Sequence, residues 1–175
     1  MTRTIGIFLG VLLLVMTVPA GLFAASYDPL LPLLVDLAGW KADPAEGIDF
    51  AQAGMSGVSE FREYPSGKQA LSATIILGMQ VGLTWMPEYK EGYKGESTEG
   101  SVEVRRIGGF LVYQIYDKAD ATTGLVVLLV EPVADKPGSG ALFVLDLGTM
   151  SIDDGLKLAQ KFDWKKMKDA AAKVK

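Results

Sequence analysis

The chain has 175 residues, of which 49% are hydrophobic and 22% charged, and its net charge at pH 7 is −4. It contains no cysteine, no histidine and no asparagine. The composition therefore excludes disulfides, thiol nucleophiles, catalytic sets that need histidine, the usual zinc and haem ligands, and N-glycosylation. No cofactor, no metal site and no catalytic residue is predicted.

The N-terminus has the features of a secretory signal peptide. Arg3 precedes an uncharged and mostly apolar run, residues 5–25, which ends in small residues before Ser26. A short basic start followed by such a run is typical of exported proteins. We predict that residues 1–25 are removed and that residues 26–175 form one periplasmic or secreted domain. The alternative is an uncleaved membrane anchor, because about 20 apolar residues suffice to cross a bilayer.

The net charge also limits the classes of partner that the chain is expected to bind. Removal of the predicted signal peptide takes away Arg3 and no acidic residue, so the net charge becomes −5. An acidic chain without a basic stripe is not expected to bind nucleic acid.

The predicted elements begin with a short N-terminal helix. Asp28 can cap it, Pro29 suits its first turn and Gly39 suits its end. Runs of strand-forming residues follow at 48–53, 58–64, 69–77, 101–107, 110–117, 125–131 and 141–147.

Turn residues join several of these strands directly. Pro65 and Gly67 suit a turn between the second and third strands. Gly108 and Gly109 tolerate the positive φ of a tight hairpin between the fourth and fifth. The run 125–131 is apolar until its last residue, which predicts a central strand covered on both faces.

The C-terminus predicts a broken helix. Ser151 can cap it, but the apolar positions change phase after Phe162. One straight helix over 152–174 would be about 35 Å long, as wide as the whole domain. We expect a bend or break near Phe162, with Asp163 as a second cap.

Together these patterns predict an α+β fold. A mainly antiparallel sheet of about five to seven strands carries a short N-terminal helix and a C-terminal helix or broken helix pair. This order of elements resembles the sandwich of the PsbP and Mog1 families, in which helices flank an antiparallel sheet. The resemblance implies a fold and carries no motif, so it implies no function.

The stretch 78–100 contains the first candidate contact residues. Trp85, Tyr89 and Tyr93 are spaced four apart beside several glycines, and aromatic side chains on a loop often bind ligands. The simpler interpretation is that Trp85 closes the core and the tyrosines cover its edge. A short helix or irregular crossing followed by an exposed loop is predicted here.

Arg105 and Arg106 form a second candidate, because guanidinium groups bind carboxylates and phosphates. Neighbouring strand residues point to opposite faces, so the pair cannot act as one clamp in a regular strand. Solvated charges at a sheet edge are the simpler interpretation.

The C-terminal segment is basic. From Leu156 onward it has seven lysines and two aspartates, a net charge of +5, which leaves −10 for the rest of the mature chain. Lysines near a helix C-terminus favour the helix dipole, which is the simpler explanation. The alternative is contact with an anionic membrane or an acidic partner through Trp164, Lys165, Lys166 and Lys168.

These observations favour an exported, non-catalytic binding or accessory protein of the cell envelope or secreted space, with an unknown protein or small ligand as its partner. One alternative is a hydrolase that uses carboxylates or a Ser-Lys pair, although the sequence singles out no such residues. The other is an envelope protein held at the membrane by residues 5–25.

Overall fold

The structure is a computed structural model that describes residues 29–52, 55–66, 69–78, 80–84, 87–133, 136 and 138–174. The predicted signal segment, residues 1–25, lies outside this part of the chain, as do Asp28 and Trp85.

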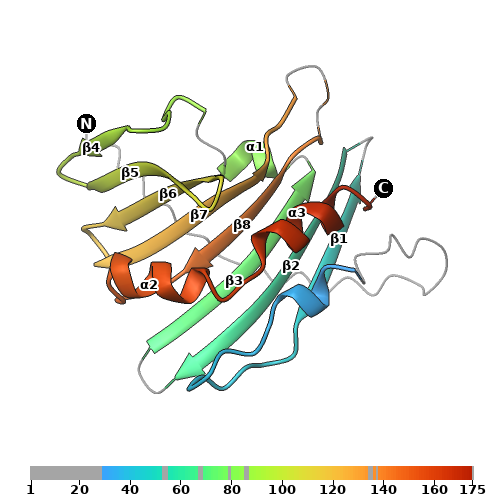
Figure 1. Cartoon of the computed structure of the whole chain (residues 1–175), viewed down its shortest axis with the longest axis horizontal. Coiled ribbons are helices and arrows are strands. Elements are labelled where there is room, and N and C mark those ends of the chain that lie inside the picture. The colour runs from blue at the N-terminus through green and yellow to red at the C-terminus, as the bar shows by residue number, and fades with distance from the viewer. Residues whose placement is uncertain are drawn as a thin grey trace.

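Eight strands form one antiparallel sheet in the order β1-β2-β3-β8-β7-β6-β5-β4 (Figure 1). Their bounds are β1 Glu46–Gln52, β2 Met55–Ser66, β3 Gln69–Gly78, β4 Lys94–Glu96, β5 Gly100–Ile107, β6 Phe110–Asp117, β7 Thr122–Val130 and β8 Ala141–Asp146. The chain builds β1 to β3 as a meander, crosses to the far edge, and returns through β4 to β7. Strand β8 then closes the gap beside β3.

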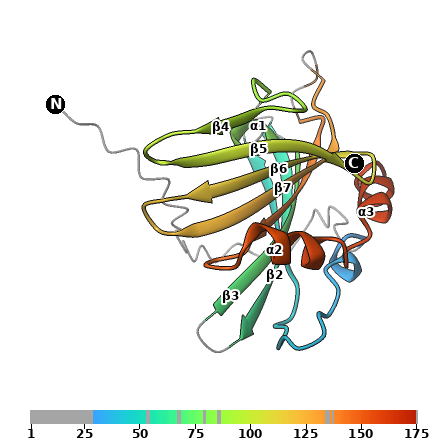
Figure 2. The same cartoon turned by 60° about the vertical axis from the view of Figure 1, so that its left-hand side comes forward.

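The helices lie mainly on one face of the sheet. Helices α2 (Ile152–Ala159) and α3 (Trp164–Ala171) cover it together with η1 (Leu31–Leu33), a short 3₁₀ turn, and the two views agree on this arrangement (Figures 1 and 2). Helix α1 (Val81–Thr84) packs through Val81 against the opposite face. The predicted α+β class with an antiparallel sheet is confirmed.

Two finer predictions are wrong. The sheet has eight strands instead of five to seven, because β4 forms within a charged, Gly-rich stretch that was predicted as a loop. Pairing with β5 holds it, with Lys94 opposite Glu103 and 3.5 Å between their charged groups. The N-terminal helix is only the three-residue turn η1, and Pro32, which has no N–H to donate, does not favour its extension.

The C-terminal helix is broken where the sequence predicts. Ser151 accepts a hydrogen bond from the Asp154 N–H at 3.2 Å and begins α2. Asp163 accepts one from the Lys166 N–H at 3.0 Å and begins α3. Each cap satisfies a backbone donor that the first helical turn leaves without a partner.

Aromatic packing fixes the junction between α2 and α3. Phe162 is 3% exposed, and its ring centroid lies 4.8 Å from that of Phe143 and 6.4 Å from that of Tyr64. Because β8 and β2 supply these two rings, Phe162 ties the helix pair to both halves of the sheet.

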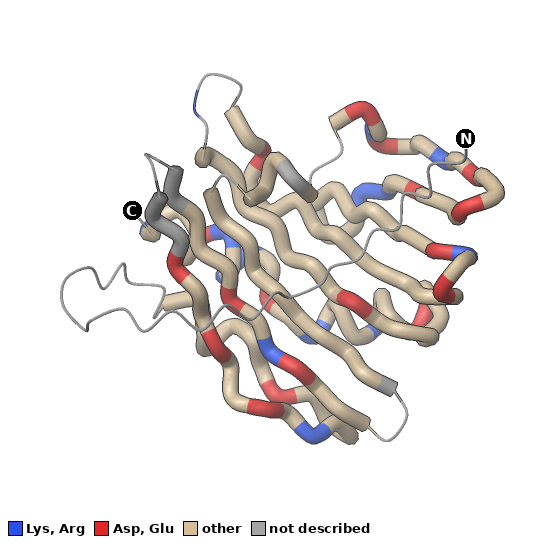
Figure 3. The backbone as a smooth tube through the Cα atoms, turned by 180° about the vertical axis from the view of Figure 1, so that it is seen from behind, with Lys and Arg blue, Asp and Glu red and all other residues tan. Residues whose placement is uncertain are grey.

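The other face of the sheet carries a smaller core. Val104, Tyr113, Val126 and Leu142 are buried there with Val81 of α1. Acidic positions recur along β1 and β2 (Figure 3). The predicted central strand is β7, whose residues 125–129 are all buried and divide between the two cores.

The turn between β5 and β6 is the tight glycine hairpin that the sequence predicts. Gly108 and Gly109 have φ values of +59° and +89°, which a residue with a Cβ adopts only with strain.

Truncation of Phe162 should destabilise the protein strongly. We expect Phe162→Ala to lower the free energy of unfolding by about 3–5 kcal/mol, because it removes a buried ring and leaves a cavity. Urea denaturation measures the change. Val133, which is 52% exposed, supplies the control, and Val133→Ala should change stability by about 0.5 kcal/mol or less. Equal effects of the two variants would contradict the packing described.

The Tyr64 hydroxyl should make stability depend on alkaline pH. It donates a hydrogen bond to the Val35 carbonyl at 2.7 Å, and burial raises its pKa from 10.0 to about 12, partly offset by nearby Arg62. The unfolded chain ionises first, so this stabilisation is complete below pH 10 and is lost as the pH rises towards 12. Tyr64→Phe should remove that part of the pH dependence in unfolding titrations between pH 9 and 12. An unchanged slope would contradict this assignment.

Candidate functional site

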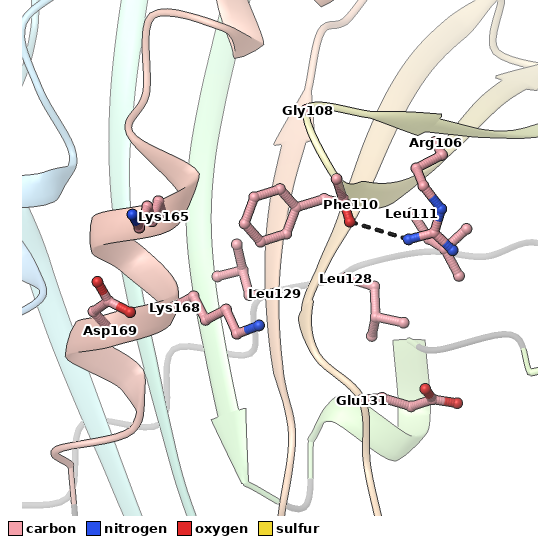
Figure 4. Close-up of a pocket in the computed structure, with 11 residues that line it drawn as sticks. Arg106, Gly108, Phe110, Leu111, Leu128, Leu129, Glu131, Lys165, Lys168 and Asp169 are labelled. Carbon is pink, nitrogen blue, oxygen red and sulfur yellow. Dashed lines mark hydrogen bonds between the residues drawn. The ribbon is translucent and has the colours of Figure 1, made fainter.

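The described residues include a pocket of about 480 Å³ at the end of the sheet where the β5–β6 turn, the end of β7 and α3 meet (Figure 4). Its apolar lining consists of Phe110, Leu111, Leu128 and Leu129. Leu111 and Leu128 are opposite each other in the register of β6 and β7, while Leu129 follows at a β-bulge. Leu128 and Leu111 belong to the smaller core and Leu129 to the core under the helices, so the pocket lies at the end of the sheet and takes its leucines from both faces.

Cationic side chains approach this apolar surface from two directions. Arg106 comes from β5, and Lys165 and Lys168 come from α3. The Lys168 side chain reaches from the helix towards Leu129 and Leu128, whereas Arg106 stands on the opposite side (Figure 4). Two residue groups that the sequence nominated separately therefore line one pocket, from opposite sides.

Hydrogen bonds hold Arg106 in place. Its Nε donates to a Glu91 carboxylate oxygen at 2.9 Å, and one terminal nitrogen donates to the Gly109 carbonyl at 3.0 Å. Lys165 and Lys168, by contrast, form no ion pair with any residue that the structure describes. These two lysines are therefore the cations of the pocket that can bind an anionic ligand.

Trp164 supports the pocket from the core side. It is 7% exposed, and its ring meets that of Phe110 edge to face, with centroids 5.9 Å apart and planes at 85°. Its side chain therefore packs inside the molecule, where it positions Phe110, and does not present its ring to solvent. Lys166 points elsewhere and pairs with Asp163 at 3.1 Å.

Arg105 lies apart from this pocket. Its Nε donates to a Glu103 carboxylate oxygen at 2.7 Å, and this hydrogen bond holds the pKa of Glu103 below its usual value. Since Arg105 and Arg106 bind different acids, they do not form one clamp, in agreement with strand alternation.

The aromatic loop adjoins the pocket through Glu91. Tyr89 and Tyr93 stack with ring centroids 4.4 Å apart and planes at 18°, and Glu91 between them holds Arg106. Tyr93 is 38% exposed and lies against Gly95, whose missing Cβ would meet the ring. Tyr89 is partly buried on the smaller core. The two tyrosines thus form a stacked pair next to Glu91, which binds Arg106 of the pocket.

The pocket can hold an anionic group joined to an apolar part. Its lysines supply charge, its Phe and Leu side chains supply apolar contact, and no Ser, Thr or Tyr hydroxyl lines it. Two carboxylates, Glu131 and Asp169, also line it, and they stand on opposite sides (Figure 4). Sequence reasoning missed Phe110, Glu131 and the leucines, and the adjacent Gly108-Gly109 turn was the one local signal for this place.

Other kinds of site are not found among the described residues. They contain no group of three or more acidic side chains arranged to hold a metal ion. They also include no helix that is long and apolar enough to cross a membrane.

Comparisons of this chain with protein-family models, with curated proteins and with solved structures give no match.

Truncation of Phe110 should expose Trp164. In a background with Trp40→Phe and Trp85→Phe, we expect Phe110→Ala to shift Trp164 fluorescence to longer wavelength and to increase its quenching by acrylamide. Tyr116→Ala is the control, because Tyr116 lies on the same strand and is 37% exposed. No shift in the Phe110 variant would contradict the contact between the two rings.

Proposed function

We propose that this chain is an exported, non-catalytic binding protein of the cell envelope or secreted space. It takes the anionic group of a small ligand or of a partner protein in the pocket between α3 and the β5–β6 turn. The proposal of export depends on the signal-like segment, residues 1–25, with an anchored envelope protein as the alternative.

A single observation carries the choice of site. Arg106 is already neutralised by Glu91, but Lys165 and Lys168 face an apolar surface without an ion pair among the described residues. An anion that brings its own apolar group can contact both these exposed ammonium groups and the Phe and Leu side chains of the pocket.

The composition supports binding over catalysis. The pocket lining lacks hydroxyl side chains, and the chain has no histidine or cysteine, so the commonest nucleophiles and bases are missing there. The residues that line the pocket therefore do not support a Ser-Lys hydrolase.

The proposal predicts selective binding of an anionic aromatic probe. Anilinonaphthalene sulfonate should bind with a fluorescence increase, and Lys165→Gln combined with Lys168→Gln should raise its Kd about fivefold, because each exposed ionic contact contributes roughly 0.5 kcal/mol. Phenylnaphthylamine has the same aromatic group without the sulfonate, and its Kd should stay unchanged.

Matched variants locate the effect. Lys94→Gln with Lys118→Gln makes the same charge change near the β4 edge of the sheet, outside the pocket lining, and should leave the sulfonate Kd unchanged. Phe110→Ala should weaken both probes, because it removes apolar lining common to them. Equal losses in the two lysine pairs would show that net charge, and not the pocket, attracts the sulfonate.

One observation favours a second candidate, a carboxylate-dependent hydrolase. Glu131 and Asp169 line the same pocket, as paired acids do in many hydrolases. Their placement on opposite sides does not favour this candidate (Figure 4). Hydrolysis of nitrophenyl ester or glycoside substrates that disappears in both Glu131→Gln and Asp169→Asn would support the hydrolase over the binding protein.

A further inference from the structure

We infer that the α3 face docks on an anionic phospholipid bilayer, with the pocket open to a lipid headgroup. This inference rests on the proposed function, because it identifies the anion as a lipid phosphate and the apolar part as the adjoining acyl region. Three features carry it: the net positive charge of the C-terminal segment, the exposure of its lysines, and the position of the first described residues beside α3.

Charge is unevenly distributed along the chain. Residues from Leu156 onward have a net charge of +5, in a chain whose total is −4. The register puts Glu46, Glu63 and Asp146 on the sheet face opposite α3, since each pairs within the row that alternates with the core under the helices. Asp49 and Glu60 lie on the helix side, since they pair with Val58 and Ile75 of the core there, so the attraction to an anionic surface comes from the C-terminal segment.

The lysines of α3 are available for this contact. Lys165 and Lys168 are exposed, and the part of the chain described here supplies neither with an acidic partner within 4.0 Å. Lys161, between α2 and α3, and Lys173, after the end of α3, are likewise exposed and have no such partner among the described residues. These four side chains, which we call the α3 lysines, are long enough to reach phosphates while their stems cover apolar surface.

The entry of the chain lies at the same side. The turn η1, which follows Pro29, neighbours α3 in both views (Figures 1 and 2). The apolar run 5–25 precedes it in sequence. The first described residues therefore lie beside the basic helix.

Flotation or co-sedimentation with vesicles tests the inference. Wild type and variants would be purified with the same N-terminus, so that any contribution of residues 1–25 is common to all. We expect binding to vesicles of phosphatidylglycerol mixed with phosphatidylcholine, weak binding to phosphatidylcholine alone, and a loss of binding at 0.5 M salt, where charges are screened within a few ångströms. Lys165→Gln with Lys168→Gln should lower the partition coefficient at least tenfold, since each lysine near an anionic surface contributes about a fivefold factor.

The control variant, Lys94→Gln with Lys118→Gln, should bind these vesicles as wild type does. Equal loss in both pairs, or equal binding to the two vesicle types, would overturn the inference. If the sulfonate probe binds with the predicted lysine dependence but the anionic vesicles do not bind, the membrane inference is wrong and the proposed pocket stands; a soluble anionic ligand or acidic protein is then the partner. If neither binds, both proposals are wrong.

Discussion

The arrangement of this molecule depends on the packing of Phe162 between the two halves of the sheet. Its ring contacts Phe143 of β8 and Tyr64 of β2, at the point where the C-terminal helix breaks. The break lets α2 cover one end of the sheet and directs α3 over the other. Without it, a straight helix would extend past the domain, and no lysine of α3 would stand above the β5–β6 turn.

A second constraint brings the turn to the helix. The Gly108-Gly109 hairpin closes tightly, so Phe110 begins β6 directly below α3 and meets Trp164. The same turn offers the Gly109 carbonyl that fixes Arg106. Packing and turn geometry thus bring the charges of Arg106 and of the α3 helix to one pocket, although they are far apart in sequence. The pocket therefore follows from the fold and not from one motif.

Much of the fold follows from local sequence patterns. Short runs of strand-forming residues, alternating or continuously apolar, predict all seven of the longer strands, and side-chain caps at Ser151 and Asp163 predict the helix break, because these signals act over a few residues. Strand β4 could not be predicted in this way. Its three residues have no intrinsic strand preference and are ordered by pairing with β5. The turn η1 shows the converse case, in which capping residues were present but Pro32 limited the helix.

The site was only partly predictable. Arg106, Lys165 and Lys168 stand out in the sequence as cations, yet nothing local indicates that β5 and α3 line the same pocket. Phe110 and Leu128 look like ordinary core residues, since an apolar strand position that lines a pocket has the same pattern as one that fills a core. Glu131 follows the end of β7, and nothing in the local sequence distinguishes it from other acidic residues. Such a site depends on tertiary packing, which sequence periodicity does not encode.

The most direct test of the account is a map of ligand contact at single residues. Backbone amide chemical shifts, recorded by NMR while anilinonaphthalene sulfonate is added, would give that map. The account predicts the largest changes at Gly108, Gly109 and Lys168, with little change along β1 and β2. Changes concentrated on β1 and β2, with the β5–β6 turn unaffected, would contradict it.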